Sequence, residues 1–234
     1  MNKSQPSLEK HIKLIIFDCD GVLLDSEEIG NRVEVEALKT LNIHINNENY
    51  QKRFAGVTTK NALNIMAQEA GATISAEFLK EVEDKIVSAI EREAKLIPYI
   101  YETLQQIKIP KVVASNSHFA RLSKILTSKG LMHFFDGYIF SADMVKYPKP
   151  APDLYLYIAQ KMLVRPDECL VIEDSATGVK AAHQAGMKVL GYIKFNNSFQ
   201  ENKDELLQAG TLQVFSDMRE LPNILSNIEK EHAK

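Results

Sequence analysis

Six short apolar runs place the strongest limit on how this chain can fold, because they recur along it with helical stretches between them. Each run is three or four residues long, rich in β-branched or aromatic residues and nearly free of polar alternation, as strands buried on both faces are. The runs cover residues 14–17, 112–114, 138–140, 170–172, 189–192 and 212–215, and amphipathic segments cover 118–129, 151–163, 176–185 and 219–231. This alternation predicts an α/β fold built on a doubly wound parallel sheet.

One interval breaks the alternation. No strand-like run occurs between residues 28 and 95, and helical periodicity covers 28–41, 59–70 and 76–96 instead. A helical stretch of this length after the first strand predicts a small all-helical domain inserted into the α/β domain. We therefore expect a core made of residues 1–27 and 96–234, and a helical cap made of residues 28–95.

The composition argues against several classes of function. Lys and Arg number 28 and Asp and Glu number 31, so the formal charge is −3 and there is no basic excess for nucleic acid or an anionic membrane. No apolar run approaches the roughly 18 residues of a membrane span. Residues 1–13 are polar and lack a signal-peptide core, and Cys19 and Cys169 lie in apolar runs, as buried thiols do. We expect a cytoplasmic protein with no nucleic-acid or membrane partner.

Polar residues follow three of the predicted strands, at the strand ends where ligands of open α/β sheets bind. Asp18, Asp20 and Gly21 follow the first run, Ser115, Asn116 and Ser117 the second, and Glu173 and Asp174 the fourth. The spacing of Asp18 and Asp20 matches the strand period of two, so both side chains can face the same way. Four carboxylates at one rim require a cation, and a set of oxygen donors favours Mg²⁺.

Lys149 lies in a loop stiffened by three prolines, at positions 148, 150 and 152. Such a loop could hold the ammonium group over the same rim, whereas a lone surface lysine would simply be solvated. Ser117 and Ser175 occupy N-cap positions before two predicted helices. A magnesium ion, a lysine and two helix N-termini together predict a site for a phosphate group. His118 could contact a substrate there, but a surface histidine in a first helical turn is the simpler interpretation.

Residues 17–27, with the sequence FDCDGVLLDSE, resemble the first motif of the haloacid dehalogenase superfamily. The resemblance is to the subgroup with a helical cap inserted after this motif, which includes phosphoglycolate phosphatase and β-phosphoglucomutase. Ser115, Lys149 and the Glu173-Asp174 pair look like the remaining three motifs, in the family's order. The likeness covers nearly the whole chain, and four ordered motifs are far more specific than one Asp-x-Asp-Gly. It implies a Rossmann-like core with a helical cap.

The resemblance also implies a Mg²⁺-dependent phosphatase that works through an aspartyl-phosphate. Asp18 would be the nucleophile, and Asp20 would protonate the leaving alcohol and then activate the hydrolytic water. The side chains of Asp18 and Asp174 and the main-chain carbonyl of Asp20 would hold Mg²⁺. Glu173 would be either a further ligand or a partner of the ligands. The transferring phosphoryl oxygens would be held by Ser115, the Asn116 amide and Lys149.

In this family the cap selects the substrate, and residues 54–61 resemble its specificity loop. Gly56 is a candidate hinge, and Thr58, Thr59 and Lys60 could contact a polar leaving group. Alternatively, Thr58 only caps the next helix and Lys60 is solvated. We expect the partner to be a small phosphorylated metabolite, either a sugar or a polyol phosphate, and the protein to be a monomer or a weak homodimer.

Other functions fit parts of the same pattern. A β-phosphoglucomutase-type mutase would return the phosphoryl group to its substrate. However, Gly30 and Thr59 stand where that pattern has a phosphate-gripping His and Arg, although Lys60 could substitute. A signalling receiver domain also has an acidic cluster, a phospho-accepting Asp and a Lys, but it is near half this length and lacks a cap. A catalytically inactive binding module is disfavoured because every catalytic position is filled.

Overall fold

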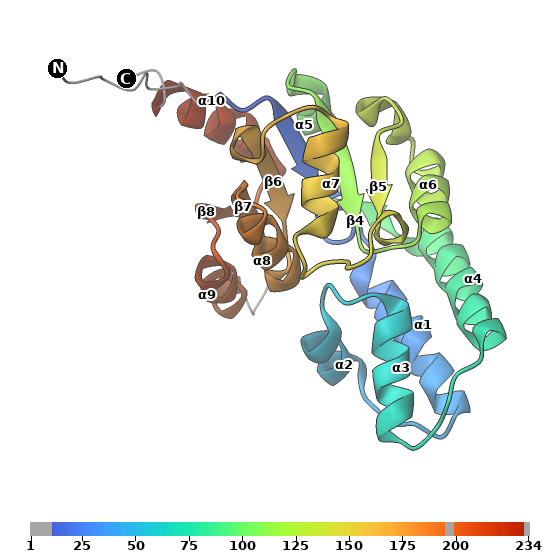
Figure 1. Ribbon diagram of the computed structural model, residues 1–234. Coiled ribbons are helices and arrows are strands. Elements are labelled where there is room, and N and C mark those ends of the chain that lie inside the picture. Colours follow the sequence, from blue (N-terminus) through green and yellow to red (C-terminus); the bar gives the residue numbers. More distant parts are fainter. Residues whose placement is uncertain (1–10, 195–198, 232–234) are drawn as a thin grey trace.

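The computed structural model describes residues 11–194 and 199–231, and in them a six-stranded parallel sheet carries helices on both faces (Figure 1). The sheet order is β5-β4-β1-β6-β7-β8. Its strands are β1 (Leu14–Phe17), β4 (Lys111–Ser115), β5 (Ile139–Ser141), β6 (Cys169–Glu173), β7 (Lys188–Tyr192) and β8 (Gln213–Phe215). All six predicted strands are confirmed to within a residue or two, and so is the doubly wound α/β fold.

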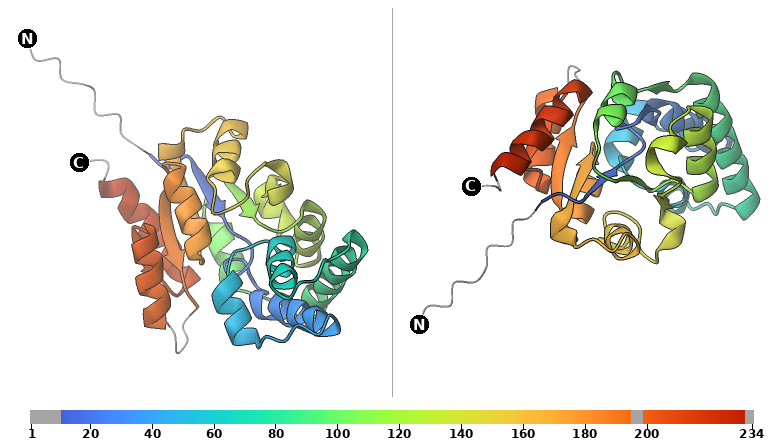
Figure 2. Two further views of the ribbon diagram at one scale, coloured as in Figure 1. Left: turned by 60° about the horizontal axis from the view of Figure 1, so that its bottom comes forward. Right: turned by 90° about the horizontal axis from the view of Figure 1, so that it is seen from above.

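Alternate residues of the buried strands point into two separate apolar layers. In β1, Ile15 and Phe17 face one layer, and Leu14 and Ile16 face the other. The first layer packs against α5 (Ile100–Gln106), α6 (Phe119–Ser128) and α10 (Leu221–Glu231). The second packs against α7 (Asp153–Lys161), α8 (Ala176–Gln184) and α9 (Phe199–Ala209). The views in Figure 2 show the strands enclosed between these two groups of helices. Burial on both sides explains why the strands are continuous apolar runs.

Four helices form the inserted cap: α1 (Glu27–Thr40), α2 (Asn47–Phe54), α3 (Thr59–Glu69) and α4 (Ala76–Glu93). The other three cap helices pack against α1. The cap lies beyond the carboxyl ends of the core strands (Figure 1). Where the chain enters and leaves it, β2 (Leu24–Asp25) and β3 (Lys95–Leu96) pair antiparallel. This pairing supports the proposed domain boundaries near residues 27 and 96.

Several elements lack a sequence signal strong enough to predict them. The α2 segment, NENYQKRF, buries only Tyr50 and Phe54, and α5 is just seven residues long. The two-residue strands β2 and β3 are too short for any periodicity, and α9 is largely polar. Short 3₁₀ turns at Met132–Phe135, Ala142–Met144, Pro166–Glu168 and Met218–Glu220 complete the connections.

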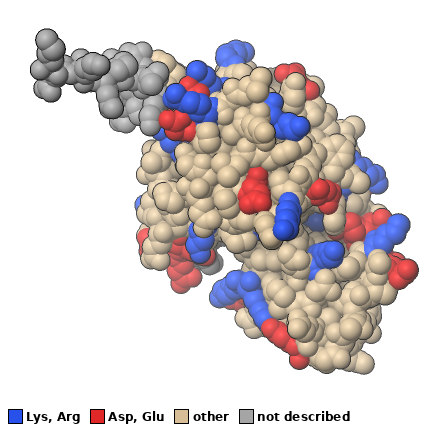
Figure 3. Space-filling view, in the orientation of Figure 1, with Lys and Arg blue, Asp and Glu red and all other residues tan. Residues whose placement is uncertain are grey.

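The charged side chains visible in Figure 3 are distributed with both signs interspersed, in agreement with the near-balance of the composition. In residues 11–194 and 199–231, none of the helices combines the length and the apolar character needed to span a bilayer.

Candidate active site

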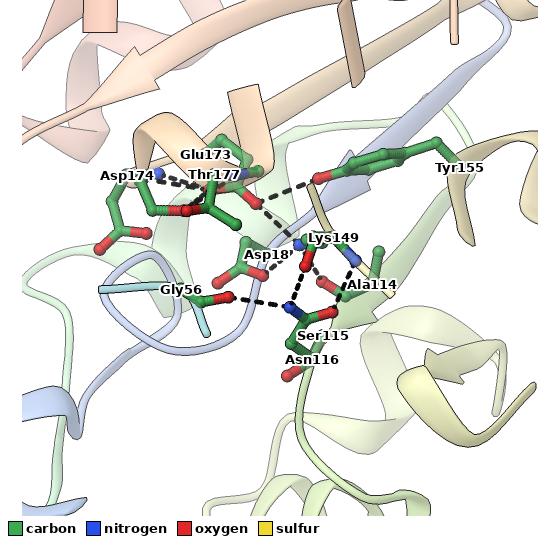
Figure 4. Close-up of polar contacts among 12 residues, drawn as sticks. Asp18, Gly56, Ala114, Ser115, Asn116, Lys149, Tyr155, Glu173, Asp174 and Thr177 are labelled. Atoms are coloured by element: carbon green, nitrogen blue, oxygen red, sulfur yellow. Dashed lines mark hydrogen bonds and ion pairs between the residues drawn. The ribbon is translucent and has the colours of Figure 1, made fainter. Parts of the chain in front are cut away.

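The register of the sheet places three strand ends at one edge. Phe17 of β1 lies opposite Val113 of β4 on one side and Ile172 of β6 on the other. Asp18, Ser115 and Glu173 therefore end adjacent strands at similar heights (Figure 4). Sheet order reverses at β1, because the chain passes to β4 and β5 on one side and then returns to β6 on the other. Such a reversal opens a crevice in which α/β proteins bind ligands.

Lys149 is buried at the centre of this edge, with 5% of its surface exposed. Its ammonium nitrogen Nζ donates to Asp18 Oδ1 at 2.6 Å, to Glu173 Oε1 at 2.7 Å and to the carbonyl oxygen of Ala114 at 3.0 Å (Figure 4). These three bonds match the three protons of an ammonium group. The interpretation of Lys149 as a solvated lysine is therefore wrong, and its charge is fixed directly beside Asp18.

Protein donors occupy both carboxylate oxygens of Glu173. Oε1 accepts from Lys149 Nζ and, at 3.1 Å, from the hydroxyl of Tyr155. Oε2 accepts from the main-chain N–H groups of Asp174 and Ser175 and from Ser175 Oγ, at 3.0–3.1 Å. A Cβ added at Gly178 would lie 1.6 Å from Oε1, so only glycine leaves room for this carboxylate. Of the two roles left open for Glu173, this geometry favours that of a partner that holds Lys149.

Asp18, Glu173 and Asp174 each offer one oxygen within 4.8 Å of the others, which is close enough to surround a metal ion. Gly21 adopts a positive φ of +84° beside Asp174. A Cβ at this position would lie 1.7 Å from Asp174 Oδ2, so only glycine lets the chain turn this close to the carboxylate. Burial raises the pKa of Asp18, although Lys149 opposes this. Burial also raises the pKa of Asp174, as do the neighbouring Glu27, Glu173 and Asp18. A cation would relieve this electrostatic cost, and oxygen donors of this kind fit Mg²⁺.

Two hydroxyl groups hold the carboxylate of Asp20. Ser26 Oγ donates to Oδ1 at 2.5 Å, and Ser117 Oγ donates to Oδ2 at 3.0 Å. Arg121 Nη2 lies 3.7 Å from Oδ1. Asp20 is therefore oriented by contacts that are separate from the Lys149 network around Asp18.

The prediction that Ser117 caps the following helix is wrong. The N-cap residue of α6 is His118, whose side chain makes no capping bond. Asp143, from the turn after β5, supplies the cap instead, since Oδ2 accepts from the main-chain N–H of Phe119 at 2.8 Å and Oδ1 bonds His118 Nδ1 at 2.7 Å. Ser117 is thereby free to bond Asp20. Ser175 does cap α8 as predicted, through a bond from the N–H of Gly178.

The side-chain amide of Asn116 joins three loops (Figure 4). Its Nδ2 donates to the carbonyl oxygens of Gly56, at 2.8 Å, and Lys149, at 3.0 Å, and its Oδ1 accepts from the N–H of Lys149 at 3.1 Å. Both of its amide protons are thus in use. Of the two amides of Asn116, this leaves the main-chain N–H as the donor available to a phosphoryl group.

The cap loop lies directly on the core. Thr177 Oγ1 donates to the carbonyl oxygen of Ala55 at 3.1 Å, and a Cβ added at Gly56 would lie 2.9 Å from Ser175 Oγ. Thr58 caps α3 by accepting from the N–H of Asn61, and Lys60 is exposed, as the simpler interpretation of this loop held. Thr58, Thr59 and Lys60 nevertheless line the same cavity as Asp18 and Asp20. That cavity has a volume of about 500 Å³, within the range of small-molecule sites.

Arg121 also lines this cavity, although no sequence motif pointed to it. It lies on α6 in the core, and only 9% of its surface is exposed. A signal was present, because Arg121 stands beside Leu122, one turn before Ile125, on the apolar face of its helix. A charged residue on a buried helix face requires a polar partner.

A family model for haloacid dehalogenase-like hydrolases matches residues 12–186. The chain therefore belongs to the haloacid dehalogenase-like hydrolases, and the helical cap that the structure shows agrees with the subgroup that its motifs resemble. The family, together with phosphatases among its relatives, makes this chain a phosphoric monoester hydrolase.

Three similar proteins show how far the likeness extends. The 6-phosphogluconate phosphatase of Escherichia coli (strain K12) is 29% identical over 179 residues, which cover 76% of this chain and 81% of the relative. Hexitol phosphatase B of the same strain is 30% identical over 187 residues, which cover 78% of this chain and 84% of that relative. A haloacid dehalogenase-like protein of unknown function from Agrobacterium tumefaciens, known from a crystal structure, is 37% identical in sequence to this chain. Its structure matches with a TM-score of 0.77 over 93% of this chain and 99% of the Agrobacterium chain.

Proposed function

We propose that this enzyme is a Mg²⁺-dependent phosphatase of a small phosphorylated metabolite, a sugar or polyol phosphate, and that it acts through an aspartyl-phosphate. The observation that carries the proposal is the Asp18–Lys149 contact of 2.6 Å, at an edge of the sheet where Asp20 and Asp174 line the same cavity. The names of two relatives, which act on 6-phosphogluconate and hexitol phosphates, support the substrate class.

The side chains of Asp18 and Asp174 and the main-chain carbonyl of Asp20 would hold Mg²⁺. When bound, the ion would supply positive charge that neutralises these carboxylates and the phosphoryl oxygens. Lys149 supplies a second positive charge, and the Glu173 network fixes its position. Lys149, Ser115 and the main-chain N–H of Asn116 would hold the phosphoryl group for in-line attack, since this reaction depends chiefly on positioning and charge.

In the first half-reaction, an oxygen of Asp18 forms a bond to phosphorus while the bond to the leaving oxygen breaks. Asp20, in its protonated form, gives its proton to that oxygen and releases an alcohol. In the second half-reaction, Asp20 takes a proton from water as the water attacks the aspartyl-phosphate, which releases phosphate and restores both carboxyl groups. The hydroxyls of Ser26 and Ser117 keep Asp20 oriented through both steps.

The test measures release of inorganic phosphate from p-nitrophenyl phosphate and from a hexitol phosphate. Activity should disappear in EDTA and return with Mg²⁺, and full activity in a demetallated, Mg²⁺-free sample would contradict the metal assignment. Asp18→Asn should form no phosphoenzyme by intact-protein mass spectrometry, and its activity should fall by about 10⁴-fold or more, the scale of losing a nucleophile. A phosphorylated Asp18→Asn protein would place the nucleophile elsewhere.

The same assay separates hydrolysis from the mutase reaction. We expect inorganic phosphate to appear in step with substrate loss. Incubation with β-glucose 1-phosphate and a trace of the 1,6-bisphosphate provides the contrast. Conversion to glucose 6-phosphate without release of phosphate would show that the enzyme is a mutase.

A further inference from the structure

The part of the cavity lined by Asp18, Lys149 and Asp174, where the phosphate would bind, is called the phosphate end below. Beyond it, a small ionic cluster joins the core to the cap. Arg121 projects from core helix α6, and Glu34 and Glu83 project from cap helices α1 and α4. Arg121 Nη1 lies 3.9 Å from Glu83 Oε1. Glu34 is 7% exposed and Arg121 9% exposed, so both charges are well shielded from water. These three residues are called the Arg121 cluster below.

The Arg121 cluster lies next to the group that would protonate the leaving oxygen. Arg121 Nη2 is 3.7 Å from Asp20 Oδ1. The carbon skeleton of the substrate, which is attached to the leaving oxygen, must therefore pass within reach of the guanidinium. Gly30 lines the cavity beside this path and presents no side chain there; even a Cβ at this position would lie 3.9 Å from Arg121 Nη2, in ordinary van der Waals contact. The leaving group therefore meets the Arg121 cluster directly after the scissile bond.

The cluster has hydrogen-bonding capacity that the protein does not use. Among the residues that the structure describes, Arg121 Nε and Glu83 Oε1 are buried atoms without a hydrogen-bond partner. A buried donor or acceptor left unsatisfied costs free energy, so these atoms favour a ligand that supplies both functions. A hydroxyl group is such a ligand, because it can donate to Glu83 and accept from Arg121.

The charge balance of the cluster opposes a second anionic group. One guanidinium lies between the carboxylates of Glu34 and Glu83, so a carboxylate or second phosphate on the leaving group would meet an excess of negative charge even while Asp20 carries its proton. The other cations of the cavity outside the phosphate end, Lys60 and Lys146, are both exposed, and Lys146 lies 4.9 Å from the Tyr147 ring centroid. Water screens exposed charges, so these lysines compensate little.

We propose that the Arg121 cluster is the specificity site for the leaving group, and that it binds hydroxyl groups of an uncharged polyol or sugar while excluding a leaving group that carries its own negative charge. The inference rests on the proposed phosphatase activity and narrows its substrate class. Because the two glutamates come from the cap and Arg121 from the core, the site exists only when the cap lies over the core.

A matched pair of substrates tests this inference. Glucitol 6-phosphate and 6-phosphogluconate share the phosphate position and the carbon chain, and differ only in a hydroxymethyl group or a carboxylate at carbon 1. We expect kcat/KM to favour glucitol 6-phosphate by about tenfold or more, the scale of one unfavourable like-charge contact. Equal rates, a preference for 6-phosphogluconate, or hydrolysis of p-nitrophenyl phosphate but of neither ester would overturn the inference. Failure to hydrolyse p-nitrophenyl phosphate as well would instead refute the proposed function.

The variant Glu83→Gln removes one negative charge at nearly constant shape. It should raise kcat/KM for 6-phosphogluconate relative to glucitol 6-phosphate and so reduce the wild-type preference about threefold or more, since one of the opposing charges is gone. Glu91→Gln is the control, because Glu91 pairs with Lys124 across the same two helices, at 2.8 Å, but outside the cavity. An unchanged preference in Glu83→Gln, or an equal change in Glu91→Gln, would contradict the proposal. The wild-type ratio needs no variant, so it decides the question even if Glu83→Gln does not fold.

Discussion

The two ends of the cavity are built differently. At the phosphate end, Lys149 lies 2.6 Å from Asp18 and 2.7 Å from Glu173, and every proton of its ammonium group has an acceptor. At the leaving-group end, Arg121 lies 3.7 Å from Asp20 and 3.9 Å from Glu83, beyond hydrogen-bonding distance, and its Nε is unpaired. The proposed phosphate end thus has its hydrogen bonds already made within the protein, whereas the proposed leaving-group end keeps bonding capacity for a substrate.

This difference has a structural origin. Asp18, Lys149 and Glu173 are all core residues; Asp18 directly follows β1, and Glu173 is the last residue of β6 in the same sheet. The Arg121 cluster instead combines a core helix with two cap helices. A site inside one sheet can be rigid in every state of the enzyme, whereas a site shared by two domains allows substrate to enter before it closes.

The largest expected effect comes from breaking the rigid end. Lys149→Ala should lower kcat by about 10²–10³-fold, the scale of losing one charge-stabilising donor. It should also lower the free energy of unfolding by about 3 kcal/mol, because it leaves Asp18 and Glu173 buried without their cation. Steady-state kinetics with saturating Mg²⁺ and urea unfolding measure the two effects. Lys149→Arg should rescue little, since a guanidinium cannot reproduce the three bonds of this ammonium.

Lys60→Ala is the matched control, because Lys60 lines the same cavity but is exposed. It should change the hydrolysis of p-nitrophenyl phosphate far less than Lys149→Ala does. Near-wild-type kinetics in Lys149→Ala would show that the buried network is structural only.

Asp20 stands between the two ends, and its variant separates chemistry from binding. Asp20→Asn should slow hydrolysis of an alkyl phosphate by about 10²-fold or more, the usual contribution of general acid–base catalysis. Formation of the phosphoenzyme from p-nitrophenyl phosphate should slow much less, because nitrophenolate leaves without a proton. Single-turnover kinetics on the two substrates measure the difference. Equal slowing of this step with both would argue that Asp20 acts through the metal site and not as an acid.

Two helical glycines test the contrast in packing. Gly178→Ala should destabilise the protein by about 1–3 kcal/mol, because its Cβ would lie 1.6 Å from Glu173 Oε1 and must displace that carboxylate. Gly30→Ala should stabilise it by up to about 1 kcal/mol, because a Cβ there meets only Arg121, at 3.9 Å, and alanine favours helix. Thermal unfolding of both variants checks the opposite signs. Destabilisation by both would mean that the leaving-group end is as tightly packed as the phosphate end.

The smallest effect is expected where the cap loop contacts the core. Thr177→Val removes the hydrogen bond to the Ala55 carbonyl oxygen and keeps the shape of the side chain. Loss of one such bond costs about 1 kcal/mol, so KM should rise by about fivefold or less while kcat changes little. Thr40→Val is the control, since Thr40 Oγ1 bonds Ala37 within the cap itself. A large fall in kcat in Thr177→Val would mean that this contact serves the chemistry and not cap closure.

Local sequence patterns predicted the elements whose residues carry their own signal. The strands are buried on both faces, so their apolar runs stand out, and Asp18 and Glu173 directly continue two of them. The missed helix α2 shows the limit of this reasoning, because its two buried side chains, Tyr50 and Phe54, leave almost no periodic pattern. The N-terminal capping bond of helix α6 shows the same limit. Asp143 accepts this hydrogen bond from the main-chain N–H of Phe119, and the two residues are 24 positions apart in the sequence.

Periodicity and spacing within short segments were enough to predict the doubly wound sheet, the inserted helical cap and the polar residues at the strand ends. The packing of distant segments was needed to show that Glu173 holds Lys149, that Asn116 joins the cap loop to the Lys149 loop, and that Arg121 lies near Glu83 in a cavity that Glu34 also lines. These contacts join segments tens of residues apart. Their geometry depends on how helices and loops pack on the sheet, and no local pattern in the chain encodes that.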